Sequence, residues 1–321
     1  MKKQILAALL VVVSCLAHAD PKLSYDGYVD VNASFNTTTT DSLLNGLHLG
    51  TAHLTVKSDN EGPNNGALIQ LIYGENALAF TSLNAGSSTS NIKQAHLYQS
   101  FGKFTVQAGK FIGFLGYELP DPNSNFNYTR SALFFAEPVY NVGVVGKYAI
   151  NDVTNLIAYG VNENSSDASL DETKDAGASL QSLGATKGLA INWYRDNSKT
   201  LGVFDHRDLL NAYSYIMLGN VTLAGEYLHS DMYFNAGAGY MSVSSGDTSA
   251  SLRGVYVSNP GTLVGDTSSQ YTMTLKHKNG NIVNAIEIVM DSSPVGIYYN
   301  TASGTSQNNQ TTLLLSSVYS F

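Results

Sequence analysis

Residue types that could carry out catalysis or hold a metal ion are sparse in this sequence of 321 residues. His48 and His53 fall on opposite faces of one expected strand, so they cannot share a metal ion. The histidines at 96, 206, 229 and 277 have no second histidine or carboxylate at ligand spacing. There is no G-x-S-x-G elbow, P-loop or dinucleotide-binding fingerprint. We therefore expect no catalytic residue, no metal site and no cofactor.

Opposite charges are concentrated in one long stretch, residues 113–138. Three carboxylates facing one guanidinium would create a transverse electric field, which is one way for a constriction to discriminate between ions. The stretch starts with the apolar run GFLGYELP, so we expect it to fold back against a wall or into a mouth. An external loop packed by its own aromatic residues fits the composition equally well. The candidate residues here are Glu118, Asp121, Arg130 and Glu137.

The elements that would position these residues are β-strands, because hydrophobicity alternates along the chain with a period of two. Between residues 23 and 35, apolar side chains occupy most odd positions and polar ones most even positions. The same alternation returns at 139–150, 269–278 and 281–290. The apolar face of such strands lies against either a soluble core or lipid.

The connections between the strands favour lipid, because short and long connections alternate. Outer-membrane barrels have tight periplasmic turns and long external loops, whereas a Greek-key sandwich does not segregate them. We therefore predict an all-β fold, a transmembrane antiparallel up-and-down β-barrel with both chain ends periplasmic. The tight turns are Gly102-Lys103, Asn151-Asp152, Gly219-Asn220 and Asn279-Gly280, and the long connections are 77–90, 113–138, 163–181 and 292–309.

We expect about 16 strands, an even number, as in bacterial single-chain barrels. The segments 199–206 and 237–245 are weakly patterned, so 14 strands are the alternative. A barrel of 16 strands leaves a water-filled lumen. The expected strands are 23–35, 46–57, 66–76, 91–101, 104–112, 139–150, 153–162, 183–194, 199–206, 208–218, 221–230, 237–245, 250–257, 269–278, 281–290 and 311–321.

Charged residues on the polar faces of these strands should point into the lumen. A charged side chain facing lipid at the bilayer midplane costs about 2–4 kcal/mol. These charges either only keep the lumen wall hydrated, or they also set the ion preference of the pore. The predicted pore-lining residues are Asp26, Asp30, Lys147, Glu226, Arg253, Lys276 and Glu287.

The first 19 residues have the form of a secretory signal peptide, with a basic start, an apolar stretch and a small-x-small site at Ala17-His18-Ala19. We expect cleavage near Ala19 and one barrel domain over residues 20–321. In the alternative, Cys15 is acylated as in a lipoprotein. Removing Lys2 and Lys3 from 17 basic residues leaves 15 against 25 acidic ones, a formal charge of −10. Nucleic acid is therefore not an expected partner.

The last strand, TTLLLSSVYSF, places Phe321 and Tyr319 on one face. Closing a barrel pairs the last strand with the first, which puts these aromatic residues in the periplasmic girdle. Alternate C-terminal aromatics resemble the signal by which outer-membrane barrels are recognised by the barrel assembly machinery. We therefore expect Tyr319 and Phe321 to form an assembly signal.

Part of the chain, about a sixth of its length, resembles a known family of porins, the OmpL-like β-barrel porins. The resemblance implies an outer-membrane diffusion pore for small polar solutes. Family members often carry histidine where this chain has Asn141. The residues that carry it are Ala108-Gly109-Lys110-Phe111, Gly116-Tyr117-Glu118, Asn125, Asn127-Tyr128-Thr129-Arg130-Ser131, Pro138 and Asn141-Val142-Gly143-Val144.

We thus expect a porin of the outer membrane, with a weak preference for cations because of the acidic trio around Arg130 and the acidic net charge. Its expected partners are outer-membrane lipid, the assembly machinery, small polar solutes or ions, and further copies of the chain in a homo-oligomer. The alternatives are an outer-membrane barrel enzyme of lipase or protease type and a secreted β-sandwich adhesin.

Deletion of Phe321 should impair assembly and leave the chain in the periplasm, because the last strand loses its terminal aromatic. Cell fractionation measures this directly. Normal insertion of the truncated chain would contradict the assembly-signal hypothesis.

Overall fold

The computed structural model describes residues 22–37, 45–59, 65–74, 92–162, 174–197, 206–231, 234–258, 267–293, 298–300 and 305–321. The predicted signal peptide, residues 1–19 with Cys15, lies outside the described residues. Nearly all of the described chain is β-strand, in agreement with the alternation of the sequence.

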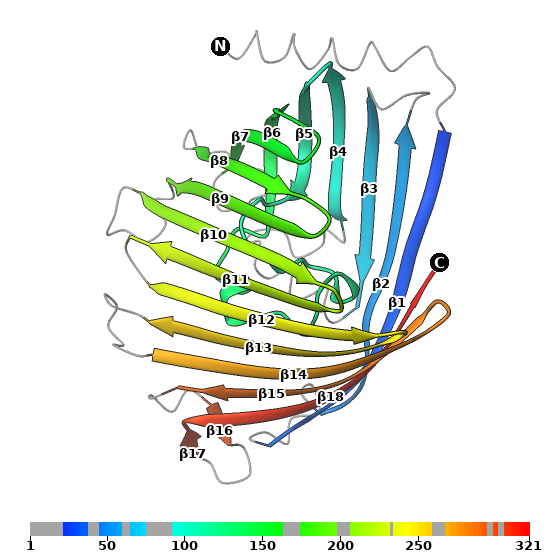
Figure 1. The fold of residues 1–321 in the computed structure, drawn as a ribbon, viewed down its shortest axis with the longest axis vertical. Coiled ribbons are helices and arrows are strands. Elements are labelled where there is room, and N and C mark those ends of the chain that lie inside the picture. Colours follow the sequence, from blue (N-terminus) through cyan, green and yellow to red (C-terminus); the bar gives the residue numbers. More distant parts are fainter. Residues whose placement is uncertain are drawn as a thin grey trace.

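Sixteen antiparallel strands close into one barrel, as predicted (Figure 1). The secreted β-sandwich alternative is therefore wrong, since one closed sheet replaces two packed ones. A small separate hairpin consists of β16 (Tyr298–Asn300) and β17 (Thr305–Gln307). The barrel strands are β1 (Lys22–Asn36), β2 (Gly46–Asp59), β3 (Asn65–Tyr73), β4 (Ile92–Phe101), β5 (Phe104–Ile112), β6 (Tyr140–Ala149), β7 (Thr154–Asn162), β8 (Lys174–Leu183), β9 (Lys187–Asp196), β10 (Arg207–Leu218), β11 (Val221–Ser230), β12 (Asn235–Ser245), β13 (Thr248–Ser258), β14 (Thr267–Asn279), β15 (Ile282–Ser292) and β18 (Asn309–Ser320).

The seam of the barrel is the pairing of β1 with β18. Nine residue pairs run from Tyr28 opposite Ser320 to Asn36 opposite Thr312. Beyond β18, Phe321 continues the ladder: its N–H donates to Gly27 O at 3.0 Å, and Gly27 N–H donates to Phe321 O at 3.1 Å. The sheet therefore has no free edge in the barrel wall.

The two rims of the barrel differ. At one rim, called the turn end here, β4 joins β5 through Gly102-Lys103, β10 joins β11 through Gly219-Asn220, and β14 joins β15 through Gly280-Asn281. Gly102, Gly219 and Gly280 have φ values of +61°, +64° and +58°, which glycine adopts without strain. The opposite rim, called the loop end, carries the long connections, including residues 113–139 between β5 and β6.

One part of the predicted strand list is wrong. The structure has β8 at 174–183, which overlaps most of its length with the expected long connection 163–181, and β9 at 187–196, in place of a single strand at 183–194. Residues 199–205 lie outside the described residues, and His206 is not in a strand. The small residues of β8 obscure its alternation in the sequence. Gly177 is one of them, and a Cβ at this position would lie 2.1 Å from Cζ of Tyr159. The neighbouring ring thus requires a small residue where alternation would show a larger one.

A β-bulge corrects the expectation for the histidines of β2. The register of β1 and β2 shifts at Gly50, so the side chains on either side of it change face. His48 and His53 are both buried inside the barrel, at 8% and 6% exposure. They pair with Asn32 and Tyr28, four residues apart on β1, or about 13 Å along the strand. They therefore cannot share a metal ion, although not for the reason predicted.

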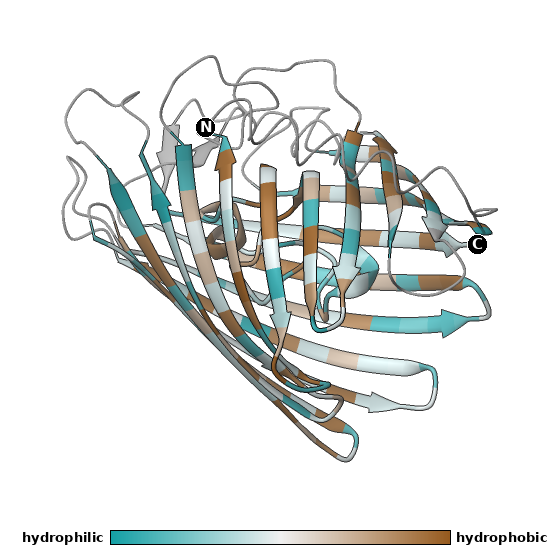
Figure 2. Ribbon diagram, turned by 90° about the horizontal axis from the view of Figure 1, so that it is seen from above, coloured by the Kyte–Doolittle hydropathy of each residue, from teal (hydrophilic) through white to brown (hydrophobic). Residues whose placement is uncertain are grey.

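The outer face of the wall is apolar. Figure 2 shows brown apolar and paler or teal polar segments alternating along individual strands. Large apolar side chains such as Leu210, Leu252 and Met273 are exposed on the outside, while their neighbours along each strand are buried inside. Among the described residues, no helix has the length and apolarity to cross a membrane.

Position along the strand should decide the cost of a charge on this face. Leu252→Arg, in the middle of β13, should destabilise the folded barrel in lipid by about 2–4 kcal/mol. Leu218→Arg is the matched control, since Leu218 is exposed beside the turn after β10, where the cost is about 0–1 kcal/mol. Equilibrium unfolding of both variants in lipid vesicles measures the difference, and equal costs would contradict the placement of this face in lipid.

Candidate functional site

The connection between β5 and β6 lies inside the barrel and not outside it. Its path passes behind β9 to β13 in Figure 1, and its hydrogen bonds end on the inner side chains of strands around the wall. It contains the short helix η1 (Pro122–Ser124) and the helical turn α3 (Ala132–Phe135). Ser131 begins α3 as its N-cap, because its hydroxyl oxygen accepts the N–H of Phe134 at 3.2 Å. We call residues 113–138 the inner loop.

One side of the inner loop packs against an apolar part of the wall. Leu115 and Leu133 join a buried cluster with Phe111, Tyr194 and Leu228, which come from β5, β9 and β11. The ring of Phe114 lies 5.2 Å from that of Tyr159. Burial of these apolar side chains holds the loop against the wall without fixing its orientation.

The strongest polar attachment is a buried ion pair between Glu118 and Arg253. Nη1 of Arg253, on β13, donates to Glu118 Oε1 at 2.7 Å, and both side chains are almost fully buried. The guanidinium also donates to Thr129 O at 2.6 Å. The other oxygen of Glu118 accepts the N–H of Ser131 at 2.9 Å and its hydroxyl. The pair therefore ties both arms of the inner loop to one strand.

Asp121 forms a second attachment on the opposite side of the lumen. It accepts hydrogen bonds from Lys93 Nζ on β4 at 2.5 Å and from the Tyr28 hydroxyl on β1 at 2.7 Å. Burial alone would raise the pKa of Asp121, but the Lys93 ammonium and the two hydrogen bonds outweigh it and hold this pKa below its ordinary value. Lys276 Nζ on β14 donates to Asn125 O at 2.6 Å.

Tyr128 and Asn127 fasten the tip of the loop near the seam. Glu287 on β15 accepts the N–H groups of Tyr128 at 2.6 Å and Thr129 at 2.9 Å. The Tyr128 hydroxyl donates to Asp30 Oδ2 at 2.6 Å. Asn127 Nδ2 donates to Thr274 Oγ1 at 2.6 Å.

Glu137 and Glu226 form a buried pair of carboxyl groups where the loop returns to β6. Both accept from Nδ2 of Asn211, at 3.0 Å and 2.7 Å. Glu226 also accepts the Tyr117 N–H at 3.2 Å and the Tyr240 hydroxyl at 3.2 Å. Burial raises the pKa of Glu137 well above its ordinary value, and the negative charge of Glu226 raises it further. Glu137 therefore stays protonated to higher pH than an exposed carboxyl group.

The structure places the predicted residues in three environments. Asp30, Glu226, Arg253 and Glu287 are buried against the inner loop, and Lys276 is half-buried against it. Asp26 and Lys147 are exposed towards the turn end. None of the three carboxylates Glu118, Asp121 and Glu137 is bonded to Arg130; they bind Arg253, Lys93 and Asn211 instead. Arg130 is buried, and its Nη1 donates to Tyr128 O at 3.0 Å.

Several residues that hold the loop were not predicted from the sequence. Lys93 faces the lumen because the register of β3 and β4 shifts past it, from Gln94 opposite Gln70 to Ile92 opposite Leu71. Plain alternation cannot locate such a bulge. Asn211 could have been singled out from the sequence, because it is an amide in the largely apolar run LLNAYSYIML.

The C-terminal aromatics lie on the outer face. The rings of Tyr319 and Phe321 are stacked at 6.4 Å, with an interplanar angle of 28°, and both side chains are exposed. This is compatible with a girdle position, and their role as an assembly signal stays a prediction.

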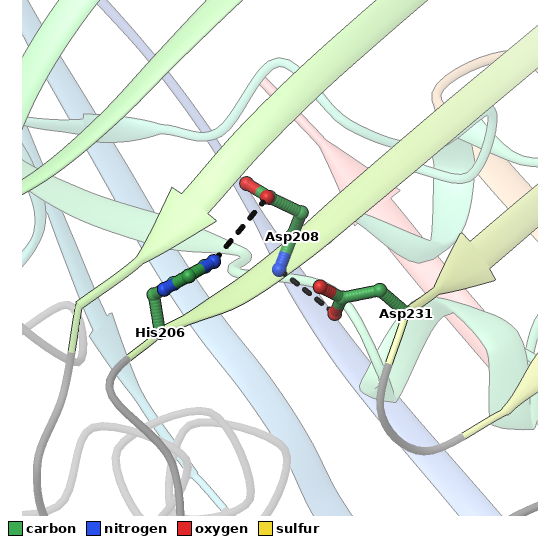
Figure 3. Close-up of side chains that lie close together, drawn as sticks. All are labelled: His206, Asp208 and Asp231. Carbon is green, nitrogen blue, oxygen red and sulfur yellow. Dashed lines mark hydrogen bonds and ion pairs between the residues drawn. The ribbon is translucent and has the colours of Figure 1, made fainter.

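A cluster at the loop end brings His206 near two carboxylates, contrary to the expectation from spacing (Figure 3). His206 Nε2 lies 3.9 Å from Asp208 Oδ2, and the Asp208 N–H donates to Asp231 Oδ1 at 3.0 Å. Arg195 already holds both oxygens of Asp208, at 2.9 Å and 2.6 Å. We therefore assign no metal ion to these three residues.

The sequence matches the family described as "Putative beta-barrel porin-2, OmpL-like" over residues 22–321. The chain belongs to this OmpL-like porin family. It is a porin-like barrel of the outer membrane. Porins are non-enzymatic channels, so the alternative of a lipase- or protease-type barrel is wrong. No curated protein sequence matches the chain.

Solved porin structures share the fold of this porin at low sequence identity. The anion-selective porin of Comamonas acidovorans has a TM-score of 0.67 and 12% identity, covering 94% of this chain and 100% of that one. OmpT of Vibrio cholerae has a TM-score of 0.63 and 10% identity, covering 94% and 98%. A mutant of the Rh. blastica porin has a TM-score of 0.62 and 13% identity, covering 94% and 100%.

Removing one partner of the buried ion pair should destabilise the porin strongly. Arg253→Met leaves the Glu118 carboxylate buried without its cation, and breaking such a pair costs about 3–5 kcal/mol. Equilibrium unfolding in lipid vesicles measures the loss. The double variant with Glu118→Gln should regain much of it, and a loss below about 1 kcal/mol in the single variant would contradict the role of the pair.

The proton on Glu137 should make stability depend on pH. Its pKa is higher in the folded porin than in the unfolded chain, so its contribution is complete below about pH 4.5 and is lost as pH rises through the folded value. The groups that face it are the carboxyls of Glu226 and Glu118, the latter paired with Arg253, and phenols that do not ionise in this range. The thermal midpoint in detergent should fall with rising pH less steeply in Glu137→Gln than in the wild type. Identical slopes would contradict this.

Proposed function

We propose that the porin forms a water-filled channel for passive diffusion of small polar solutes and ions, with the inner loop as its constriction. The observation that carries the proposal is the inner loop itself, fixed by buried polar contacts across a closed barrel of 16 strands. A barrel of this size has room for an aqueous path, and an inward loop narrows it. The turn end, with both chain ends, is the periplasmic side in this proposal.

A weak cation preference is supported by the way the inner carboxylates are satisfied. Glu287 and Glu226 accept hydrogen bonds from neutral N–H and hydroxyl groups, so their hydrogen bonds leave the negative charge in place. The basic residues Arg253 and Lys93 are each paired with a carboxylate. Arg130 and Lys276 donate to backbone carbonyl groups, and their positive charges oppose those of the carboxylates, which keeps the proposed preference weak. The anion-selective porin of Comamonas acidovorans shares only the fold, and its charge preference does not transfer at 12% identity.

Single-channel recording in planar bilayers tests the channel. The purified porin should produce stepwise ion conductance without nucleotide, metal or organic cofactor. Complete absence of conductance from a correctly folded barrel, checked by its heat-modifiable gel mobility, would show that the inner loop seals the lumen.

The Arg130→Glu variant tests whether the inner loop sets ion preference. It should raise the cation over anion permeability ratio, measured as a reversal potential in a salt gradient. The effect should shrink at high salt, because the Debye length falls from about 10 Å at 0.1 M to about 3 Å at 1 M. Lys187→Glu makes the same charge change at an exposed position of β9 and should have little effect. Equal ratios in wild type and Arg130→Glu would contradict the constriction role.

Assembly into a homo-oligomer is part of the proposal. OmpT of Vibrio cholerae has been solved in a trimer form. The apolar outer face of this porin is the surface on which copies would pack in the membrane. Gel mobility of unheated samples after chemical cross-linking separates an oligomer from a monomer.

A further inference from the structure

The inner face of the barrel wall is buried on one side and open to the lumen on the other. In the middle of β9 to β15, inward side chains such as Asn211 and Glu287 are buried under the inner loop. On β3 to β5 the inward side chains are half-buried over most of the strand length, and full burial returns only towards the loop end. We call this second part the open wall. Its polar members are Gln70, Gln94, His96, Tyr98, Thr105 and Gln107.

The open wall is rich in hydrogen-bonding groups and poor in charge. Gln94 Nε2 donates to Gln70 Oε1 at 2.6 Å, and Gln70 Nε2 donates to Thr55 Oγ1 on β2 at 3.2 Å, so amides and a hydroxyl form a row across three strands. The described strands β3 to β5 contain two charged residues. Lys93 is 2% exposed and bound to Asp121, and Lys110 alternates with Phe111, which lies inside the barrel, and so belongs to the opposite face.

The inner loop likewise turns its charges away from the lumen water. Glu118, Arg130 and Glu137 are buried, and Asp121 is bonded to Lys93 and Tyr28 of the wall. These charges reach the lumen only through their long-range field, in keeping with a weak ion preference. The exposed residues of the inner loop are all uncharged, namely Leu119, Asn123, Ser124, Ala132 and Phe135.

A passage between two uncharged surfaces discriminates between solutes through their hydration. An ion that enters a narrow path without an opposite charge loses hydration that nothing replaces. A hydroxyl group both donates and accepts hydrogen bonds, as a side-chain amide does, so a hydroxylated solute exchanges bonds with water for comparable bonds with the wall. The open wall therefore suits solutes with many hydroxyl groups and no charge.

From this arrangement we infer that the aqueous path runs along β3 to β5 and that its substrates are neutral, polyhydroxylated molecules of monosaccharide type. The inference rests on the proposed channel and names the class of solute that this channel admits. Gln70, Gln94 and Gln107 are the side chains that bind the hydroxyl groups of the solute along the path.

Uptake of radiolabelled solutes into proteoliposomes tests the inference, with the membrane potential clamped at zero. Glucose is the neutral probe. Gluconate and glucosammonium, used at a pH where the amine is protonated, have the same carbon skeleton with one negative or one positive charge. Glucose should enter at least about threefold faster than either ion, because each ion loses hydration that the open wall does not replace.

Amide-to-carboxylate variants test the assignment of the path. Gln94→Glu places a negative charge on the open wall with little change of shape, so the ratio of glucose to glucosammonium uptake should fall to about one or below. Gln107→Glu should act in the same direction, and it guards against misfolding of the first variant. Asn220→Asp makes the same chemical change at an exposed position in the turn between β10 and β11 and should leave the ratio unchanged.

Glucose uptake no faster than that of the two ions, or an unchanged ratio in both glutamine variants, would overturn the inference. Ion conductance in planar bilayers separates this result from a failure of the channel itself. A porin that conducts ions without favouring glucose disproves only the substrate class, whereas one that passes neither ions nor glucose disproves the proposed channel and this inference with it.

Discussion

The constraint on which this structure depends is that no backbone N–H or C=O group can stay unpaired in the lipid. The chain meets it with a single closed sheet, in which β1 pairs with β18 and Phe321 extends the ladder to Gly27. Once the sheet is closed, each strand has one face in lipid and one in the lumen. The lumen then receives every charged side chain that the lipid face excludes.

The inner loop is the second level of organisation, and it has two kinds of contact with the wall. Apolar packing of Leu115 and Leu133 joins it to the side formed by β5 to β13, where Asn211 and Glu226 add hydrogen bonds. Ionic and hydrogen-bonded contacts alone join it to β1, β4, β14 and β15. The apolar side gives adhesion without precise geometry, and the polar side fixes position. Glu118 with Arg253 connects the two, because this pair lies where the apolar cluster ends and the polar contacts begin.

The sequence contained enough information for the barrel, since alternation and turn residues are local signals. It located the inner loop as unusual through its apolar start and its charges, and it listed Glu118, Asp121 and Glu137. It did not reveal their partners, because Arg253, Lys93 and Asn211 come from distant strands. Bulges were the main source of error: they moved His48 and Lys93 to the lumen side, and a bulge depends on pairing with the neighbouring strand, not on residue type.

The reach of the inner loop also has a kinetic consequence. Tyr128 bonds to Glu287, 159 positions later in the chain, and Glu118 bonds to Arg253, 135 positions later. Contacts at such separations form late, because long segments must be ordered first. The attachments of Glu118 and Tyr128 therefore form only when β13 to β15 are in place, whereas Lys93 of β4 is available to Asp121 earlier. Glu118 therefore lacks its Arg253 partner until late in assembly, and the packing of the interior is completed only when the final strands arrive.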